Sequence, residues 1–94
     1  MKTTLTIITY DIPDDKRRTK IHKLLSGYGQ WTQYSLFECW LSEKEWVRLR
    51  FEIEAVGLAG EDSIRFYRLC AACGDRVETL DGKGKPAEPL AFMI

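Results

Sequence analysis

The segment TLTIITYDIPDD, residues 4–15, decides the fold that this sequence can adopt. Apolar side chains point to both sides of an expected strand at 4–10: Leu5 and Ile7 to one side, Ile8 and Tyr10 to the other. A strand of this kind is central in its sheet and covered on both faces. Pro13 ends the strand because proline lacks the amide donor of the ladder, and Asp14 or Asp15 can cap a helix behind it.

A first helix is expected from this cap to about Tyr28. Its apolar residues recur at helical spacing and form one face: Ile21, Leu24, Leu25 and Tyr28. Gly27 and Gly29 mark its end. Residues 30–41, QWTQYSLFECWL, are rich in aromatic and β-prone side chains. They predict either one bent strand or two short strands in a tight hairpin.

Residues 42–45, SEKE, form a capping box and predict the start of a second helix. This helix should run to about residue 56 and bury one side: Trp46, Leu49, Ile53 and Val56. The alternation of DSIRFYRLC at 62–70 predicts a further strand, and RVETL at 76–80 can pair back as another.

This order of elements predicts a split β-α-β, ferredoxin-like α+β sandwich in one domain at 1–80. Two helices can cover only one face of the sheet, so the doubly apolar first strand predicts a homodimer whose sheets face each other. Residues 81–89, DGKGKPAEP, are expected to be an exposed linker. The apolar tail LAFMI at 90–94 should add as a strand to a sheet edge of the partner subunit.

The composition indicates a small globular chain without a strong overall charge. Of 94 residues, 45% are hydrophobic, and 14 basic residues balance 14 acidic ones. Zero net charge forces no nucleic-acid partner, because strong general binding usually comes with a basic domain, but the more basic first half could carry a local patch. The start is too polar for a signal peptide, and no stretch reaches the length of a membrane span. Three cysteines, an odd number without secretory context, favour reduced thiols in a cytoplasmic protein.

Asp11 is the candidate metal ligand because its carboxylate stands where the first strand should end. A carboxylate is a hard oxygen ligand suited to Mg²⁺ or Mn²⁺, but one alone binds such an ion weakly. A two-fold dimer would present two copies of Asp11 and could place an ion between them. The alternative is an ordinary Asx-turn before Pro13.

Basic residues crowd the expected start of the first helix: Lys16, Arg17, Arg18 and Lys20. They could contact nucleic-acid phosphates beside the metal, or they could form a solvated turn paired with Asp14 and Asp15. His22 has no evident partner and is interpreted as a surface residue. Cys70 and Cys73 form a CxxC pair without the second pair that a structural zinc site needs, so they are interpreted as ordinary thiols.

Four segments, in this order along nearly the whole chain, resemble the CRISPR-associated protein two family: Tyr10-Asp11-Ile12, DDKRR at 14–18, Gly29 through TQYSLFE at 32–38, and DSIRFYRL at 62–69. The resemblance implies a ferredoxin-like homodimer that takes part in antiviral adaptation beside the spacer-acquisition integrase. It also implies metal-dependent cleavage of RNA or double-stranded DNA, with Asp11 as metal ligand and catalytic residue.

Further positions carry over from the same resemblance. Four residues match positions that lie near the family's catalytic centre: Tyr10, Arg18, Ser35 and Phe37. The chain departs from the family pattern at Trp31, where an arginine is common. Lys20 stands where some relatives have a second arginine in the helix; it keeps the positive charge but lacks the bidentate hydrogen bonding of a guanidinium. Lys16 and Arg18 would steady charge on the scissile phosphate.

Three hypotheses of function remain open. The first is a metal-dependent endonuclease. The second is a non-catalytic dimeric adaptor that holds duplex DNA between integrase subunits. Zero net charge favours the adaptor, because a partner could then supply most of the DNA affinity. The third is a redox or regulatory domain built on the CxxC pair, which would need bound zinc or a dithiol that cycles.

Overall fold

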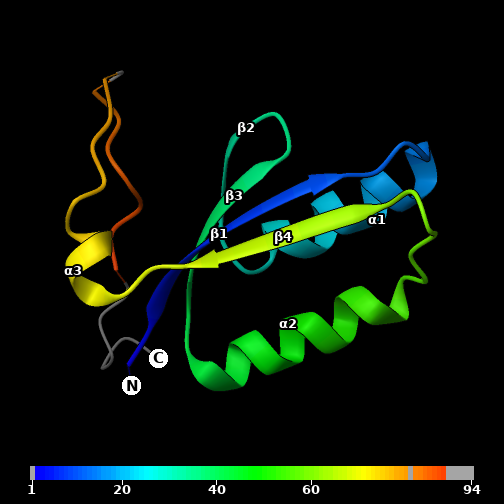
Figure 1. The fold of residues 1–94 in the computed structure, drawn as a ribbon, viewed down its shortest axis with the longest axis horizontal. Helices are drawn as coiled ribbons and strands as arrows, with labels where there is room; N and C mark the ends of the chain where they lie inside the picture. The colour runs from blue at the N-terminus through cyan, green and yellow to red at the C-terminus, as the bar shows by residue number, and fades with distance from the viewer. Residues whose placement is uncertain (1, 81, 89–94) are drawn as a thin grey trace.

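A four-stranded antiparallel sheet forms the centre of the computed structural model, which describes residues 2–80 and 82–88 (Figure 1). Within the described residues the strands lie in the order β2-β3-β1-β4: β2 spans Gln30–Gln33, β3 Leu36–Leu41, β1 Thr4–Asp11 and β4 Ser63–Arg68. β1 pairs with β3 on one side and with β4 on the other, in both cases antiparallel. This arrangement confirms the predicted ferredoxin-like α+β fold.

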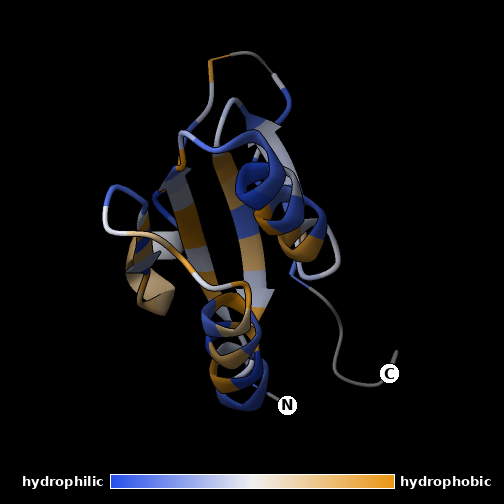
Figure 2. Ribbon diagram, turned by 90° about the vertical axis from the view of Figure 1, so that its right-hand side faces the viewer, coloured by the Kyte–Doolittle hydropathy of each residue, from blue (hydrophilic) through white to orange (hydrophobic). Residues whose placement is uncertain are grey.

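Two helices connect the strands and pack on one face of the sheet. α1 (Asp15–Ser26) links β1 to β2, and α2 (Glu43–Ala55) links β3 to β4. Both helices alternate hydrophobic and hydrophilic bands (Figure 2), as amphipathic helices on a sheet do. Their buried residues join those of the sheet in one core: Ile21, Leu25, Leu49 and Ile53 with Ile8, Tyr10, Phe37, Cys39 and Leu41. Among the described residues no helix has both the length and the apolar character needed to cross a membrane.

Side chains cap both of these helices, as predicted. The carboxylate of Asp14 accepts a hydrogen bond of 2.9 Å from the amide of Arg17. At α2 the amide of Glu45 donates to Ser42 Oγ at 3.2 Å, and the amide of Ser42 donates to Glu45 Oε1 at 2.8 Å. Each cap satisfies amides that a helix start leaves without an intrahelical partner, which explains why both helices begin where the sequence predicted.

Residues 30–41 form two strands joined by a tight turn, which is the hairpin alternative of the sequence prediction. The turn contains Tyr34, whose φ of 46° lies in the left-handed region. Bulky residues rarely adopt this conformation because of steric conflict with the backbone. The pairing of β2 with β3 shifts register between Trp31 and Gln33, so the hairpin is irregular near its turn.

The outer face of the sheet, opposite α1 and α2, changes in burial along β1. Leu5 is buried, Ile7 and Thr9 are half-buried, and Asp11 is exposed. The short helix α3 (Ala71–Gly74) packs against β1 at the Leu5 end, and Figure 1 places it at the end of the sheet away from the β1–α1 connection. The predicted homodimer through this outer face stays a prediction.

The prediction of a strand at 76–80 is wrong. After β4 the chain enters α3, and the amides of Arg76 and Val77 donate to the carbonyls of Cys73 and Gly74 at 3.1 and 3.3 Å. Because these donors are used inside the turn that closes α3, they do not add to the ladder of the sheet.

Residues 82–88 fold back on the α3 end of the molecule. Trp40 Nε1 donates to the carbonyl of Pro86 at 2.8 Å, and Thr3 Oγ1 donates to Glu88 Oε2 at 2.8 Å. The predicted tail strand at 90–94 lies outside the described residues, so its pairing with a partner subunit stays a prediction.

Candidate functional site

Asp11 ends β1 on the outer face of the sheet and is exposed to solvent. It lies opposite Ser63 in the β1–β4 pairing. A shallow depression surrounds it, lined by residues of these two strands: Thr9, Tyr10, Asp11, Ser63, Arg65 and Tyr67. The carboxylate is therefore open to a ligand, with an arginine and two hydroxyl-bearing side chains of β4 in the same depression.

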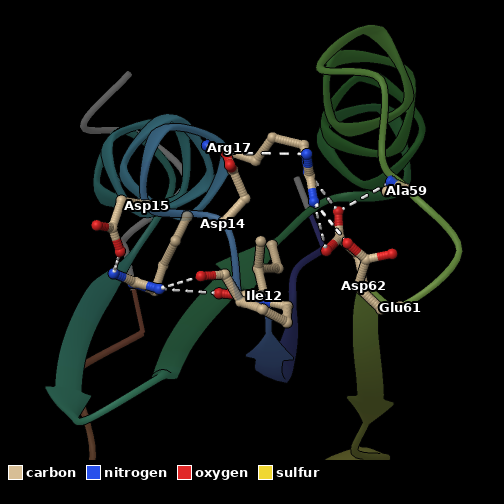
Figure 3. A network of polar contacts seen from close by, with 9 residues as sticks. Ile12, Asp14, Asp15, Arg17, Ala59, Glu61 and Asp62 are labelled. Carbon is tan, nitrogen blue, oxygen red and sulfur yellow. Dashed lines mark hydrogen bonds and ion pairs between the residues drawn. The ribbon is translucent and has the colours of Figure 1, made fainter.

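Arg17 joins the start of α1 to the loop between α2 and β4 (Figure 3). Its Nε donates to Asp62 Oδ2 at 2.7 Å and its Nη2 to Asp62 Oδ1 at 3.2 Å, the two-point geometry that fits a guanidinium to a carboxylate. The amide of Ala59 donates to the same carboxylate at 2.9 Å. These hydrogen bonds, that of Arg17 first, lower the pKa of Asp62 below its usual value. Arg17 thus holds two connections together at the Asp11 end of the sheet.

Arg18 points to a different set of partners. Its Nη1 donates to the carbonyls of Ile12 and Pro13 at 3.0 and 3.2 Å, and its Nη2 pairs with Asp15 (Figure 3). Its side chain stays 42% exposed. Arg18 therefore stabilises the β1–α1 turn, while part of its side chain stays exposed to solvent.

Lys16 and Lys20 are exposed on α1, one turn apart. Among the described residues neither lysine forms a salt bridge, whereas Arg17 and Arg18 both do. Of the predicted cations, these two are the ones whose charge is directed to solvent rather than to a carboxylate of the same chain.

Tyr10, Ser35 and Phe37 come together beneath the hairpin turn, on the face opposite Asp11. The hydroxyl of Tyr10 and His22 Nδ1 are 2.9 Å apart, and the ring of Phe37 meets that of His22 edge to face at 5.1 Å. Burial raises the pKa of Tyr10. The amide of Tyr10 also donates to the carbonyl of Ser35 at 3.1 Å, which ties the end of β1 to the turn.

His22 is the residue of this cluster that sequence reasoning missed. It was interpreted as a surface residue without a partner, but it is half-buried and contacts Tyr10 and Phe37. Its position next to Ile21 and three before Leu25 borders the apolar stripe of α1, and this was the available signal.

The donors near Asp11 are of the type that a hard cation prefers. The carboxylate of Asp11 and the hydroxyl of Ser63 both offer oxygen. The described part of the chain contains no group of three or more His, Cys, Asp or Glu side chains that could hold a metal ion. The type of donor therefore fits Mg²⁺ or Mn²⁺, but among the described residues Asp11 is the one carboxylate that lines this depression.

The fold, with an exposed carboxylate at the end of β1, defines a small ferredoxin-like α+β protein. The family model described as CRISPR associated protein Cas2 matches residues 4–77. The chain is 45% identical over 82 residues to the CRISPR-associated endoribonuclease Cas2 3 of Synechocystis sp., covering 87% of this chain and 86% of that one. The chain belongs to the Cas2 family.

Solved structures with a similar fold support the same family. The crystal structure of Streptococcus pyogenes Cas2 at pH 6.5 matches with a TM-score of 0.69 and 36% identity, over 81% of this chain and 98% of that chain. A chain of a partial Cas6-RT-Cas1–Cas2 complex matches with a TM-score of 0.74 and 26% identity, over 97% and 99%. The family prediction is confirmed, and so, at the level of the family, is the resemblance to endonucleases, because the Synechocystis relative is named an endoribonuclease.

Proposed function

We propose that this protein is a metal-dependent endonuclease of CRISPR adaptation that hydrolyses phosphodiester bonds of RNA or double-stranded DNA. The observation that carries the proposal is the exposed carboxylate of Asp11 at the end of β1, in a depression that also contains Ser63 and Arg65. The name of the Synechocystis relative supports the class of reaction. This protein acts in the cytoplasm, because its three free cysteines favour a reducing compartment.

Asp11 and its copy in a second subunit would hold Mg²⁺ or Mn²⁺ between them. Such an ion, when bound, stabilises charge on a phosphoryl oxygen and makes a water more acidic. Arg65 lies in the same depression and binds the phosphate that Asp11 faces. Lys16 and Lys20 attract the neighbouring phosphates by charge. Arg17 keeps the start of α1 in place through Asp62, so its role is to position these cations.

The protein acts as a homodimer together with the spacer-acquisition integrase. The half-buried side chains of Ile7 and Thr9 on the outer face support a second copy of the chain there, because two facing sheets would remove them from water. The structural likeness to a chain of a complex that contains Cas1 and Cas2 supports the integrase as partner.

One observation favours the second candidate, a non-catalytic adaptor that holds DNA in the integrase complex. Asp11 is the sole carboxylate among the residues that line its depression in the described part of the chain. A single carboxylate binds a divalent ion weakly. Without a close second copy the site would hold nucleic acid but would not cleave it.

The experiment that separates the two candidates is Asp11→Asn, assayed for cleavage with Mg²⁺ and for spacer acquisition beside the integrase. Loss of both cleavage and spacer acquisition supports the endonuclease, provided that the variant folds and dimerises as the wild type does. Loss of cleavage with full acquisition supports the adaptor. Asp75→Asn is the matched control, because it makes the same chemical change at an exposed aspartate near α3, and it should leave both readouts unchanged.

A further inference from the structure

Two large aromatic side chains stand in solvent at the β2–β3 hairpin. Trp31 is 52% exposed and Tyr34 is 88% exposed. Tyr34 also holds a left-handed backbone conformation, with a φ of 46°, at a position where glycine or asparagine would be less strained. A strained and exposed tyrosine contributes little to the stability of the fold, which points to a use for its ring outside the fold.

The two aromatic residues are held together by the hairpin itself. Trp31 Nε1 donates to the carbonyl of Tyr34 at 2.7 Å, so the indole fixes the turn that presents the tyrosine. On α1, the ring of His22 meets the ring of Trp31 edge to face, with centroids 6.1 Å apart. Trp31 is therefore held by one hydrogen bond and one ring contact, and about half of its surface remains open to a ligand.

A depression of about 400 Å³ lies between this turn and α1. Residues of three elements line it: Tyr10, Arg18, Thr19, His22, Tyr34 and Ser35. No carboxylate belongs to this lining in the described part of the chain. Arg18, which pairs with Asp15 outside the lining and keeps 42% of its side chain exposed, brings positive charge to it. Lys23, exposed and one helical turn after Thr19, brings a second cation to the same side of α1.

We infer that this surface, the hairpin platform of Trp31, Tyr34 and Arg18, binds an unpaired nucleotide of single-stranded nucleic acid. Exposed aromatic rings beside cations are the combination that binds single strands, because bases stack on the rings while phosphates contact the cations. A base inside a duplex is already stacked and presents no free face to the tyrosine. The platform therefore selects strands with unpaired bases.

The platform also adjoins the proposed cleavage site. Tyr10 lines both this depression and the depression that contains Asp11, so the two lie on either side of the end of β1. A strand whose base stacks on Tyr34 can pass around this end and bring a neighbouring phosphate toward Asp11. The inference rests on the proposed function in this respect, and it names the form of substrate that the site takes.

The test is a binding measurement in EDTA with short fluorescent single strands of RNA and of DNA of one sequence, read by anisotropy, with strand integrity checked on a gel. Tyr34→Gly removes the ring and relieves the left-handed strain, so the variant should fold at least as well as the wild type. It should bind both strands roughly fivefold to a hundredfold more weakly, the loss expected for one stacked base. Tyr34→Phe keeps the ring and should bind within about twofold of the wild type.

Two controls make the result specific. Phe51→Ala removes another exposed aromatic ring, 73% exposed on α2, and should leave binding unchanged. An abasic strand of the same length keeps the phosphates and lacks the bases, so it should bind the wild type and Tyr34→Gly equally.

The inference is overturned if Tyr34→Gly binds single strands as the wild type does, or if the wild type binds none. Equal losses for a fully paired duplex would also overturn it, because a duplex offers no unpaired base. A loss with RNA alone or with DNA alone supports the platform and identifies its strand. Failure of the proposed function is separate: it would be seen as cleavage by Asp11→Asn, and it leaves the binding result standing.

Discussion

The two faces of β1 differ more than their sequence suggests. On the inner face Ile8 is fully buried and Tyr10 nearly so, under α1 and α2. On the outer face burial falls from Leu5, next to α3, to the exposed Asp11 at the other end. Each face has two apolar residues in sequence, Ile8 and Tyr10 on the inner face and Leu5 and Ile7 on the outer face. The chain itself buries both of the inner ones but only Leu5 of the outer ones.

This difference separates stability from function along one strand. The inner face supplies the core, so its side chains are set by packing. The open end of the outer face supplies the carboxylate of Asp11, and the hairpin beside it supplies Tyr34. The following predictions test how sharply the two faces are divided.

The largest effect is expected for Phe37→Ala on the inner face. Phe37 is fully buried, and truncating such a ring should lower the free energy of unfolding by about 3–5 kcal/mol. Tyr67→Ala, on the outer face at 47% exposure, should cost under about 1 kcal/mol in chemical denaturation at low protein concentration. A cost for Tyr67→Ala that grows with protein concentration would indicate that a second copy covers the outer face.

Gly29→Ala should be the next largest effect, about 1–3 kcal/mol of destabilisation. A Cβ at Gly29 would lie 2.2 Å from Sγ and 2.7 Å from Cβ of Cys39, on the inner side of β3. Gly60→Ala is the control, because no atom lies within 4 Å of its added Cβ. Thermal unfolding of both variants checks the contrast, and equal stabilities would contradict the close packing of Gly29 on β3.

Asp62→Asn should lower stability at neutral pH, because it removes the charge that Arg17 binds in the loop between α2 and β4. The pKa of Asp62 is lowered in the fold, so its ionised form stabilises the protein above the unfolded value of about 3.9. That contribution is lost as the pH falls through the lowered pKa. Urea unfolding across pH should therefore show a gap between variant and wild type that closes in acid; a constant gap would argue against the ion pair.

The smallest effect is on reactivity rather than stability. Burial raises the pKa of Cys39 on the inner face to about 12, whereas the amide of Cys73 lowers the pKa of Cys70 beside α3. Because the thiolate is the reactive form, iodoacetamide should modify Cys70 first and Cys39 last in the folded protein. Peptide mass spectrometry over time measures the order, and early labelling of Cys39 would mean that the inner face opens readily.

The sequence by itself determined the elements whose causes are local. The caps at Asp14 and Ser42 and the apolar spacing of both helices predicted their starts within a residue, because a cap and its partner lie three positions apart. The apolar side chains on both sides of 4–10 and the alternation within 62–70 likewise predicted β1 and β4, which pair with each other. The four segments that resemble the family, taken together and in order, were sufficient to predict it.

Only the tertiary structure decided which charged and aromatic side chains are free. Arg17 and Arg18 are neighbours in sequence, but Arg17 pairs with a carboxylate 45 positions away, whereas Arg18 pairs with the nearby Asp15 and lines the depression beside Tyr34. His22 gained its partner from β1. The strand expected at 76–80 was replaced by α3 and its closing turn. Contacts of this kind depend on how strands align in the sheet, and no local spacing encodes that alignment.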